Sequence, residues 1–195
     1  MRFTEPIKDK DKILAIKDLL LREDSPRNYL LFTFGVNSAL RIGDLLSLRV
    51  KDILNGKGGF REELEIKLQK TRKNISIYLN DPIKKALTLY FDKGQAIDPN
   101  DFLFYSFRRG GFRDKAISRV RAFKLIKKWT KAVGLDPEKY SCHSLRKTWG
   151  YFARKQGANI ELISEMLGHR NSNITRKYLG ITKEELRELI KKIEI

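Results

Sequence analysis

The apolar residues of this chain recur mainly at helical spacing, with one central region that alternates instead. Apolar side chains three and four positions apart over residues 9–22 predict a first amphipathic helix. A second helix is expected from Ser25, as its N-cap, and Pro26, in its first turn, to about Leu40. The segment IGDLLSLRV predicts a short helix that leads into a strand.

Residues 49–80 have the pattern of β-structure. ELEIKLQ and NISIYLN alternate between apolar and polar residues, as half-buried strands do, and KTRK lies between them as a turn. A third strand is expected near Val50 to Leu54. These residues predict a small antiparallel sheet.

Helical patterns return after the hairpin, and glycines mark most of their ends. Asp81 and Pro82 suit the N-cap and first turn of one helix, and Thr182 with Glu185 forms a capping box that opens the last one. The predicted fold class is therefore mainly α with a small antiparallel β-sheet (α+β). The expected helices are 81–91, 115–133, 143–156, 160–167, 173–179 and a terminal one within 181–195.

The composition is that of one folded domain. The 195 residues, 41% of them hydrophobic, suffice for a core. No apolar run approaches the roughly 20 residues of a membrane span, and the N-terminus lacks the apolar segment of a signal peptide. Cys142 is the single cysteine, so no internal disulfide is expected. We therefore expect a cytoplasmic protein.

The charge of the chain is strongly one-sided. Lys and Arg number 41 against 24 Asp and Glu, a net charge of +17, which predicts a polyanionic partner. Nucleic acid fits best, with ribosomal RNA as a special case, and an anionic membrane ranks below it. A charge that serves only solubility is the alternative.

The basic excess concentrates between Arg108 and Lys131, where Asp114 is the single acid. Such a stripe is typical of contact with a phosphate backbone. A solvated basic face above an apolar underside that includes Val120 and Phe123 is the alternative, and both interpretations can hold together. The predicted DNA-binding residues are Arg108, Arg109, Arg113, Arg119, Arg121, Lys124, Lys127 and Lys128.

Some residues have the chemistry to hold a phosphate. His143 and Arg146 are three positions apart and share a helix face, and arginine grips phosphate with two hydrogen bonds. Arg41 follows an apolar helix, where an ion pair with Asp44 is its structural alternative. Because basic residues are common in this chain, neither feature identifies a site alone.

Three further residues each have an ordinary structural explanation. Lys70, beside the hairpin turn, is by default a solvated lysine. His169 suits a helix cap or the core, and Tyr178 suits a half-buried position on a helix. Their meaning depends on their order in the chain.

The order and spacing of these six residues resemble the tyrosine recombinase (phage integrase) family over about residues 25–180. The stretch 157–169 also fits the family pattern G-x-x-x-x-x-I-x-x-x-L-G-H. Lys67 and Lys73 lie close enough to compete with Lys70. The residues that carry the resemblance are Arg41 in ALRIGDLLSL, Lys70 in LQKTRKNISIYL, His143 and Arg146 in HSLRKTW, His169 in LGHRNSNIT and Tyr178 in TRKYL.

The chain departs from the family pattern in places. Lys147 stands where many members have a second histidine, and Cys142 stands where many have proline, but the chemistry depends on neither position. Only 24 residues precede the expected helix that leads to Arg41, so we expect the family's usual N-terminal core-binding domain to be absent. We therefore expect residues 1–195 to form a single catalytic domain, either excised or from a naturally short member.

The resemblance implies an enzyme that breaks and rejoins DNA as a site-specific recombinase or integrase. Tyr178 is expected to attack a phosphodiester and form a 3′-phosphotyrosyl intermediate, which the partner strand's 5′-hydroxyl resolves without ATP, metal or other cofactor. Nearby cations are expected to favour the phenolate of this tyrosine.

The resemblance also implies roles for the other five residues. Arg41 and Arg146 are expected to hold the non-bridging oxygens, and His169 to donate a further hydrogen bond. His143 is expected to take the phenolic proton or to support Arg146. Lys70 is expected to protonate the leaving oxygen.

The implied partners are double-stranded DNA, further copies of the chain in a dimer to tetramer on DNA, and accessory DNA-bending proteins, with no membrane contact. The terminal helix within 181–195 is expected to dock on a neighbouring protomer or to pack on its own domain. Two rival functions stay open: type IB topoisomerase-like nicking and resealing, and a non-catalytic, integrase-derived regulator.

Other enzyme classes fit the sequence poorly. A metal-dependent nuclease needs clustered carboxylates or histidines, and the chain has only two histidines. A thiol enzyme built on Cys142 and His143 is disfavoured because adjacent side chains point apart on a helix.

Overall fold

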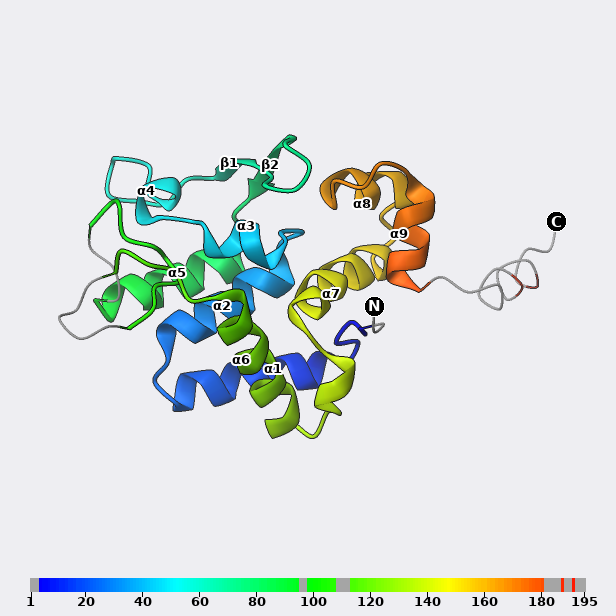
Figure 1. Ribbon diagram of the computed structural model, residues 1–195, viewed down its shortest axis with the longest axis horizontal. Coiled ribbons are helices and arrows are strands. Elements are labelled where there is room, and N and C mark those ends of the chain that lie inside the picture. The colour runs from blue at the N-terminus through cyan, green and yellow to red at the C-terminus, as the bar shows by residue number, and fades with distance from the viewer. Residues whose placement is uncertain (1–3, 95–97, 108–112, 181–186, 188–190, 192–195) are drawn as a thin grey trace.

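The computed structural model describes residues 4–94, 98–107, 113–180, 187 and 191. The predicted class, mainly α with one small antiparallel sheet, is confirmed (Figure 1). In chain order the elements are α1 (Lys10–Arg22), α2 (Pro26–Asn37), α3 (Ile42–Leu46), α4 (Val50–Ile53), β1 (Glu63–Lys67), β2 (Asn74–Tyr78), α5 (Asp81–Asp92), α6 (Arg119–Ala132), the 3₁₀ turn η1 (Pro137–Lys139), α7 (Cys142–Lys155), α8 (Ile160–Met166) and α9 (Ser172–Leu179).

Capping side chains and glycines set many of the helix ends. Ser118, Asn159 and Asn171 each accept a hydrogen bond from the backbone N–H three residues further on, which satisfies one of the unpaired groups at a helix start. Gly168 and Gly180 follow α8 and α9 with φ of 55° and 69°, a left-handed conformation that glycine adopts without steric cost.

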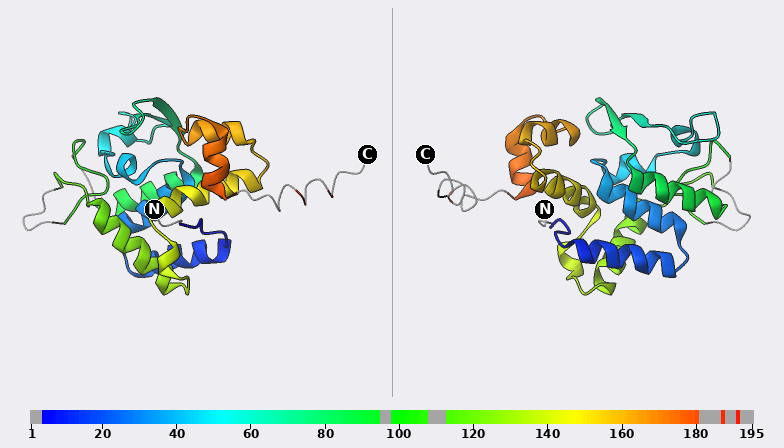
Figure 2. Two further views of the ribbon diagram at one scale, coloured as in Figure 1. Left: turned by 45° about the vertical axis from the view of Figure 1, so that its right-hand side comes forward. Right: turned by 180° about the vertical axis from the view of Figure 1, so that it is seen from behind.

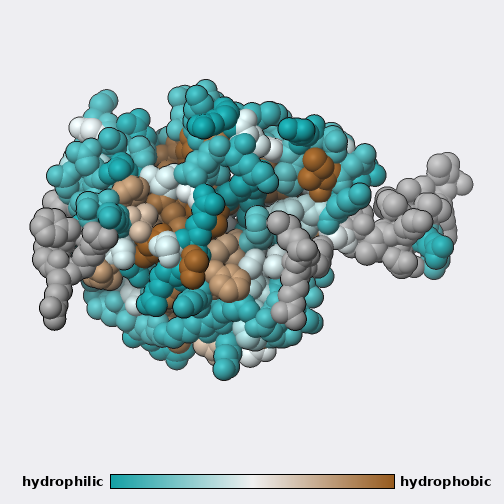
Figure 3. Space-filling view, in the orientation of Figure 1, coloured by the Kyte–Doolittle hydropathy of each residue, from teal (hydrophilic) through white to brown (hydrophobic). Residues whose placement is uncertain are grey.

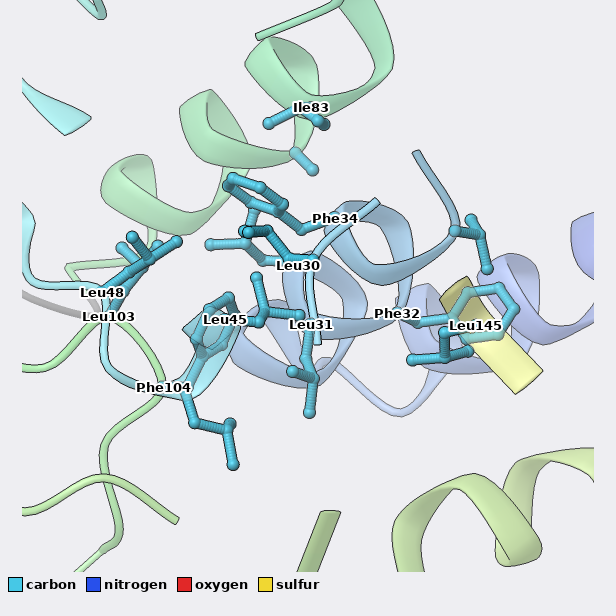
Figure 4. Close-up of a cluster of buried hydrophobic side chains, with 14 of the residues drawn as sticks. Leu30, Leu31, Phe32, Phe34, Leu45, Leu48, Ile83, Leu103, Phe104 and Leu145 are labelled. Atoms are coloured by element: carbon cyan, nitrogen blue, oxygen red, sulfur yellow. The ribbon is translucent and has the colours of Figure 1, made fainter. Parts of the chain in front are cut away.

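Helix α2 forms the centre of the core and packs against α1, α5 and α7. Figure 4 shows Leu30, Leu31, Phe32 and Phe34 of this helix among apolar side chains from other elements. All four are fully buried, and burial of a leucine or phenylalanine contributes about 1.5–3 kcal/mol. This packing holds the end of α2, and with it Arg41, in a defined position relative to α7.

A smaller apolar cluster joins α7, α8 and α9 at one end of the molecule (Figures 1 and 2). Ile163 and Leu167 lie buried at its centre, and Leu179 packs against them. Helix α9 packs closely on α7 at Gly150, where a Cβ atom would lie 2.8 Å from Leu179 Cδ2. Tyr178 belongs to the same cluster, so the docking of α9 on α7 decides its position.

Strands β1 and β2 form the predicted hairpin, antiparallel and with Glu63 opposite Tyr78. The hairpin turn approaches the end of α8, because a Cβ atom on Gly168 would lie 3.0 Å from Leu68 Cδ1. The two segments follow the same edge of the molecule (Figures 1 and 2). The turn that carries Lys70 is therefore close to the segment that carries His169.

The prediction of a third strand near Val50 to Leu54 is wrong. Residues 50–53 form α4, a single helical turn, and Asp52 closes its start by accepting the backbone N–H of Arg49 at 2.8 Å. A short apolar segment fits a strand or a buried helical turn equally well, and this carboxylate favours the turn.

Helix α6 differs from the prediction in its start and in its buried face. It begins at Arg119 rather than 115, because Ser118 caps it. Val120 and Phe123, expected underneath, are 63% and 37% exposed. Figure 3 shows a mainly hydrophilic face of the molecule on which apolar residues gather near the centre. The buried residues of α6 are Ala122, Leu125, Ile126, Trp129 and Thr130.

Smaller differences concern helix ends. Helix α2 ends at Asn37 rather than Leu40, and Ser25 makes no capping hydrogen bond. Asn80, not Asp81, caps α5. Arg108, Arg109 and nearly all of the expected terminal helix lie outside the described residues. Among the described helices, none has the length and apolar character to cross a membrane.

Candidate active site

A cavity of about 430 Å³ opens where α3, the hairpin turn, α6 and α7 meet. Four of the six predicted site residues line it. Arg41 lies directly before α3, Lys70 lies in the turn, and His143 and Arg146 lie on the first turns of α7. The other lining residues are Ile42, Gly43, Asp44, Gln69, Arg119 and Cys142.

The two arginines bring incompletely satisfied guanidinium groups to this cavity. Arg146 is buried, and its Nη2 donates to the carbonyl oxygen of Leu167. Within the described ranges, Arg146 Nε and Arg41 Nη1 are buried without a hydrogen-bond partner. Each such group costs about 1–3 kcal/mol. Burial first, and then the charge of Arg41, lower the pKa of Arg146 to about 10, so it remains protonated at neutral pH.

The alternative explanation of Arg41, an ion pair with Asp44, is not what the structure contains. Asp44 is buried, and its Oδ1 accepts the backbone N–H of Gln69 at 2.8 Å. Its Oδ2 has no hydrogen-bond partner among the described residues. The carboxylate thus holds the hairpin turn, and the charge of Arg41 remains available to an anion.

His143 stands at the exposed edge of the cavity. Partial burial, and then the positive charges around it with Arg146 foremost, lower its pKa. The imidazole is therefore neutral at pH 7 and can accept a proton. The backbone carbonyl of His143 accepts a long hydrogen bond from the hydroxyl of Tyr178, at 3.4 Å.

His169 and Tyr178 do not line the cavity but lie beside Arg146. Their rings meet edge to face with centroids 5.2 Å apart, and the Arg146 guanidinium lies 5.9 Å from the centre of the tyrosine ring. His169 Nδ1 is 2.8 Å from Thr175 Oγ1. Burial, and then the charge of Arg146, lower the pKa of His169 to about 4. A threonine hydroxyl that donates to Nδ1 leaves the imidazole proton on Nε2, able to donate.

Arg146 and Arg41 favour the phenolate of Tyr178, as expected, but burial outweighs them in the protein alone. Burial raises the pKa of Tyr178 to about 12, although Arg146 and Arg41 act in the opposite direction. The ammonium group of Lys147 lies 4.9 Å from the centre of its ring and donates to the Thr4 carbonyl oxygen at 2.7 Å. The hydroxyl therefore needs a proton acceptor before it can attack.

Of the three lysines that compete in the hairpin, Lys70 lines the cavity. Lys67 borders a separate hollow beside α4. The backbone carbonyl of Lys73 closes the turn by accepting the N–H of Leu68 at 2.9 Å. Position in the fold thus favours Lys70.

Sequence patterns missed two residues that contact the site. Gln69 bonds to Asp44 and lines the cavity, and Thr175 is fully buried against His169. Neither belongs to a recognisable motif. Cys142 also lines the cavity, but burial raises the pKa of its thiol to about 11, which disfavours a thiolate nucleophile. The described residues include no group of three His, Cys, Asp or Glu side chains suited to a metal ion.

The predicted DNA-binding residues differ in what they contact. Arg113, Lys127 and Lys128 form ion pairs with acids of the same chain. Arg121 and Lys124 on α6 have no side-chain partner within the described part of the chain. Of the predicted residues on α6, these two therefore have no competing partner inside the described part of the chain.

Comparison with known proteins identifies the family. The model of the phage integrase family matches residues 8–185. Probable integrase/recombinase YoeC of Bacillus subtilis is 34% identical over 191 residues, which cover 98% of this chain and 97% of that protein. Tyrosine recombinase XerC of Caldanaerobacter subterraneus is 30% identical over 182 residues, which cover 90% of this chain and 48% of that protein. The chain belongs to the phage integrase family, as the sequence motifs predicted.

Solved structures establish the same fold. XerA recombinase aligns with a TM-score of 0.76 and 20% identity over 100% of this chain and 66% of that one. XerH site-specific recombinase, bound to a palindromic difH substrate, aligns with a TM-score of 0.70 and 21% identity over 98% and 54%. A lambda integrase dimer bound to a core site aligns with a TM-score of 0.64 and 21% identity over 92% and 60%. The chain thus spans 48% to 66% of the XerC relative and of these three structures.

Proposed function

We propose that this protein cleaves and rejoins double-stranded DNA at specific sites by the tyrosine recombinase mechanism. The observation that carries the proposal is the meeting of Arg41, Lys70, His143 and Arg146 around one cavity, with Tyr178 packed against the arginine and His143. DNA binding and assembly of several copies on DNA are proposed by analogy with the XerH complex and the lambda integrase dimer.

The cavity suits a phosphodiester. As the Tyr178 oxygen bonds to phosphorus, the bond to the 5′-oxygen breaks, and a 3′-phosphotyrosyl link replaces it. Negative charge grows on the non-bridging oxygens, where Arg41 and Arg146 donate hydrogen bonds. The partner strand's 5′-hydroxyl reverses the step, and because the bond energy is conserved the reaction needs no ATP.

Proton transfer follows from the electrostatics of the site. His143 is neutral at pH 7 and takes the phenolic proton, which the high pKa of Tyr178 makes necessary. His169, also neutral, donates Nε2–H to a phosphate oxygen. Lys70 delivers a proton to the departing 5′-oxygen.

The test is trapping of a covalent adduct. The substrate is a pool of nicked duplexes with random sequence around the nick. The nick lets the cleaved fragment diffuse away, so the adduct cannot be resealed. The sequences recovered in the adduct reveal the preferred site. Wild-type protein is expected to form a detergent-resistant adduct with chelator present, and Tyr178→Phe none. Tyr151→Phe, which alters a tyrosine of α7 outside the cavity, is the matched control and retains the adduct.

The possible failures have different meanings. An adduct that persists in Tyr178→Phe contradicts the assignment of the nucleophile. No adduct from any sequence in the pool contradicts enzymatic function and favours a non-catalytic regulator. If the protein relaxes a supercoiled plasmid but does not join strands of two different duplexes, the topoisomerase-type alternative is favoured.

A further inference from the structure

Gln69, the residue before Lys70, is bonded through both its backbone and its side chain. Its backbone N–H donates to Asp44 Oδ1 at 2.8 Å, and its Nε2 donates to the carbonyl oxygen of Gly43 at 3.3 Å. Its Oε1 accepts a hydrogen bond from Arg119 Nη2, also at 3.3 Å. One glutamine thus ties the hairpin turn to α3 and to the first residue of α6.

Arg119 fits this arrangement because Gly43 has no side chain. A Cβ atom on Gly43 would lie 2.5 Å from Arg119 Nη2 and 3.0 Å from its Cζ. The guanidinium therefore lies against the backbone of α3, at a spot that only glycine leaves open. Both Arg119 and Gln69 line the cavity beside Lys70.

The hairpin needs such a tie to present Lys70 in one place. Leu64 and Ile77 pack the two strands of the hairpin into the core, whereas Gln69 in the turn is exposed. Lys70 itself is exposed, and a lysine side chain has many rotamers. A turn held on α3 and α6 limits where its ammonium group can reach.

We propose that Gln69 and Arg119 form a clip that positions Lys70 at the leaving oxygen. In this clip Gln69 acts as a positioning residue, through hydrogen bonds to α3 and α6 and without contact to DNA. The inference rests on the proposed function, since it assumes that Lys70 protonates the 5′-oxygen.

A substrate that needs no general acid separates positioning of Lys70 from other defects. In one form of the selected duplex, sulfur replaces the bridging 5′-oxygen at the scissile phosphate. As the Tyr178 oxygen bonds to phosphorus, the phosphorus–sulfur bond breaks and the sulfur leaves as a thiolate that requires no proton. Variants that harm only proton delivery are slow on ordinary DNA and fast on the sulfur form.

The variants are expected to differ in their cleavage rates on the two substrates. Lys70→Ala loses about 100-fold on ordinary DNA, the usual contribution of a general acid, and recovers on the sulfur form. Gln69→Ala loses no more than Lys70→Ala, since a misplacement of about 1 Å can cost about 100-fold, and recovers likewise. Arg41→Ala is slow on both forms because it acts on the non-bridging oxygens.

Two further single variants serve as controls for the effect of Gln69→Ala. Gln69→Met keeps the side-chain length and the backbone bond to Asp44, so it tests the clip even where Gln69→Ala folds poorly. Asn74→Ala removes an exposed amide from the same hairpin and is expected to cleave like the wild type. In the double variant of Gln69→Ala with Arg119→Ala, the losses are expected to be less than multiplicative, as for two residues that act as one unit.

The clip is overturned if Gln69→Met cleaves ordinary DNA at the wild-type rate, or if it is equally slow on both substrates. An inactive wild type on both substrates overturns the proposed function instead. The two failures are therefore distinguishable in one experiment.

Discussion

The rings of His169 and Tyr178 meet edge to face, with centroids 5.2 Å apart and planes at 77°. Helix α9 controls both partners of this contact. It carries Tyr178 in its last turn, and its Thr175 holds the imidazole that stands just before the helix. The position of α9 on α7 therefore governs the nucleophile and its neighbouring hydrogen-bond donor together.

We expect Gly150→Ala to lower both stability and activity. Its Cβ atom would lie 2.8 Å from Leu179 Cδ2. Such overpacking typically costs about 1–3 kcal/mol, which exceeds the gain of about 0.8–1 kcal/mol that alanine brings to a helix interior. Tyr178, next to Leu179, shifts as α9 gives way. Urea unfolding and the rate of adduct formation measure the two effects. Lys155→Ala, at an exposed position of the same helix, is the control, and a Gly150→Ala variant that matches it in both measurements contradicts the prediction.

Sulfate is expected to stabilise the wild-type protein more than it stabilises the Arg41→Met variant. Arg41 and Arg146 line the cavity, so a phosphate-like anion that enters it can accept hydrogen bonds from their guanidinium groups, and binding to the folded state raises its stability. Melting temperatures in sulfate and in chloride of equal ionic strength measure this difference. Sulfate also stabilises proteins generally, so the contrast between the two proteins is the readout. An identical response in both rules out anion binding through Arg41.

The folded protein is expected to lose stability as the pH falls from about 6.5, the ordinary pKa of histidine. Burial lowers the pKa of His169 to about 4, so the unfolded chain binds more protons than the folded one within that window. The contribution is fully present above pH 6.5 and declines below it. His169→Gln is expected to show a shallower decline in urea unfolding between pH 6.5 and 5, a range chosen to limit carboxylate titration. A slope equal to that of the wild type counts against a buried neutral imidazole.

The basic residues of α6 are expected to contribute unequally to DNA affinity. Arg121 and Lys124 have no side-chain partner in the described part of the chain, whereas Lys127 and Lys128 pair with acids. Each phosphate contact adds about 0.9 to the slope of log affinity against log salt. Alanine at Arg121 and Lys124 should therefore reduce the slope by up to about 2, and alanine at Lys127 and Lys128 by less. Fluorescence anisotropy with a labelled duplex over a salt series measures these slopes. Equal reductions of the slope in the two pairs of variants contradict the ranking.

The sequence by itself determined most of the elements and the order of the site residues. Alternation in ELEIKLQ and NISIYLN predicts the hairpin, and glycines 168 and 180 mark the ends of α8 and α9. These features depend on the backbone geometry of a few neighbouring residues, so local patterns predict them. The order of Arg41, His143, Arg146 and Tyr178 likewise indicated the family before any distance was known.

Only the tertiary structure decided questions of burial and of distance between remote segments. It placed Lys70 rather than Lys67 at the cavity, and it turned Val120 outward. It also raised the pKa of Tyr178, because desolvation by the packed helices outweighs the arginines. Such outcomes depend on how α3, the hairpin, α6 and α7 pack together, and residues so far apart in the chain leave no local pattern that encodes their contact.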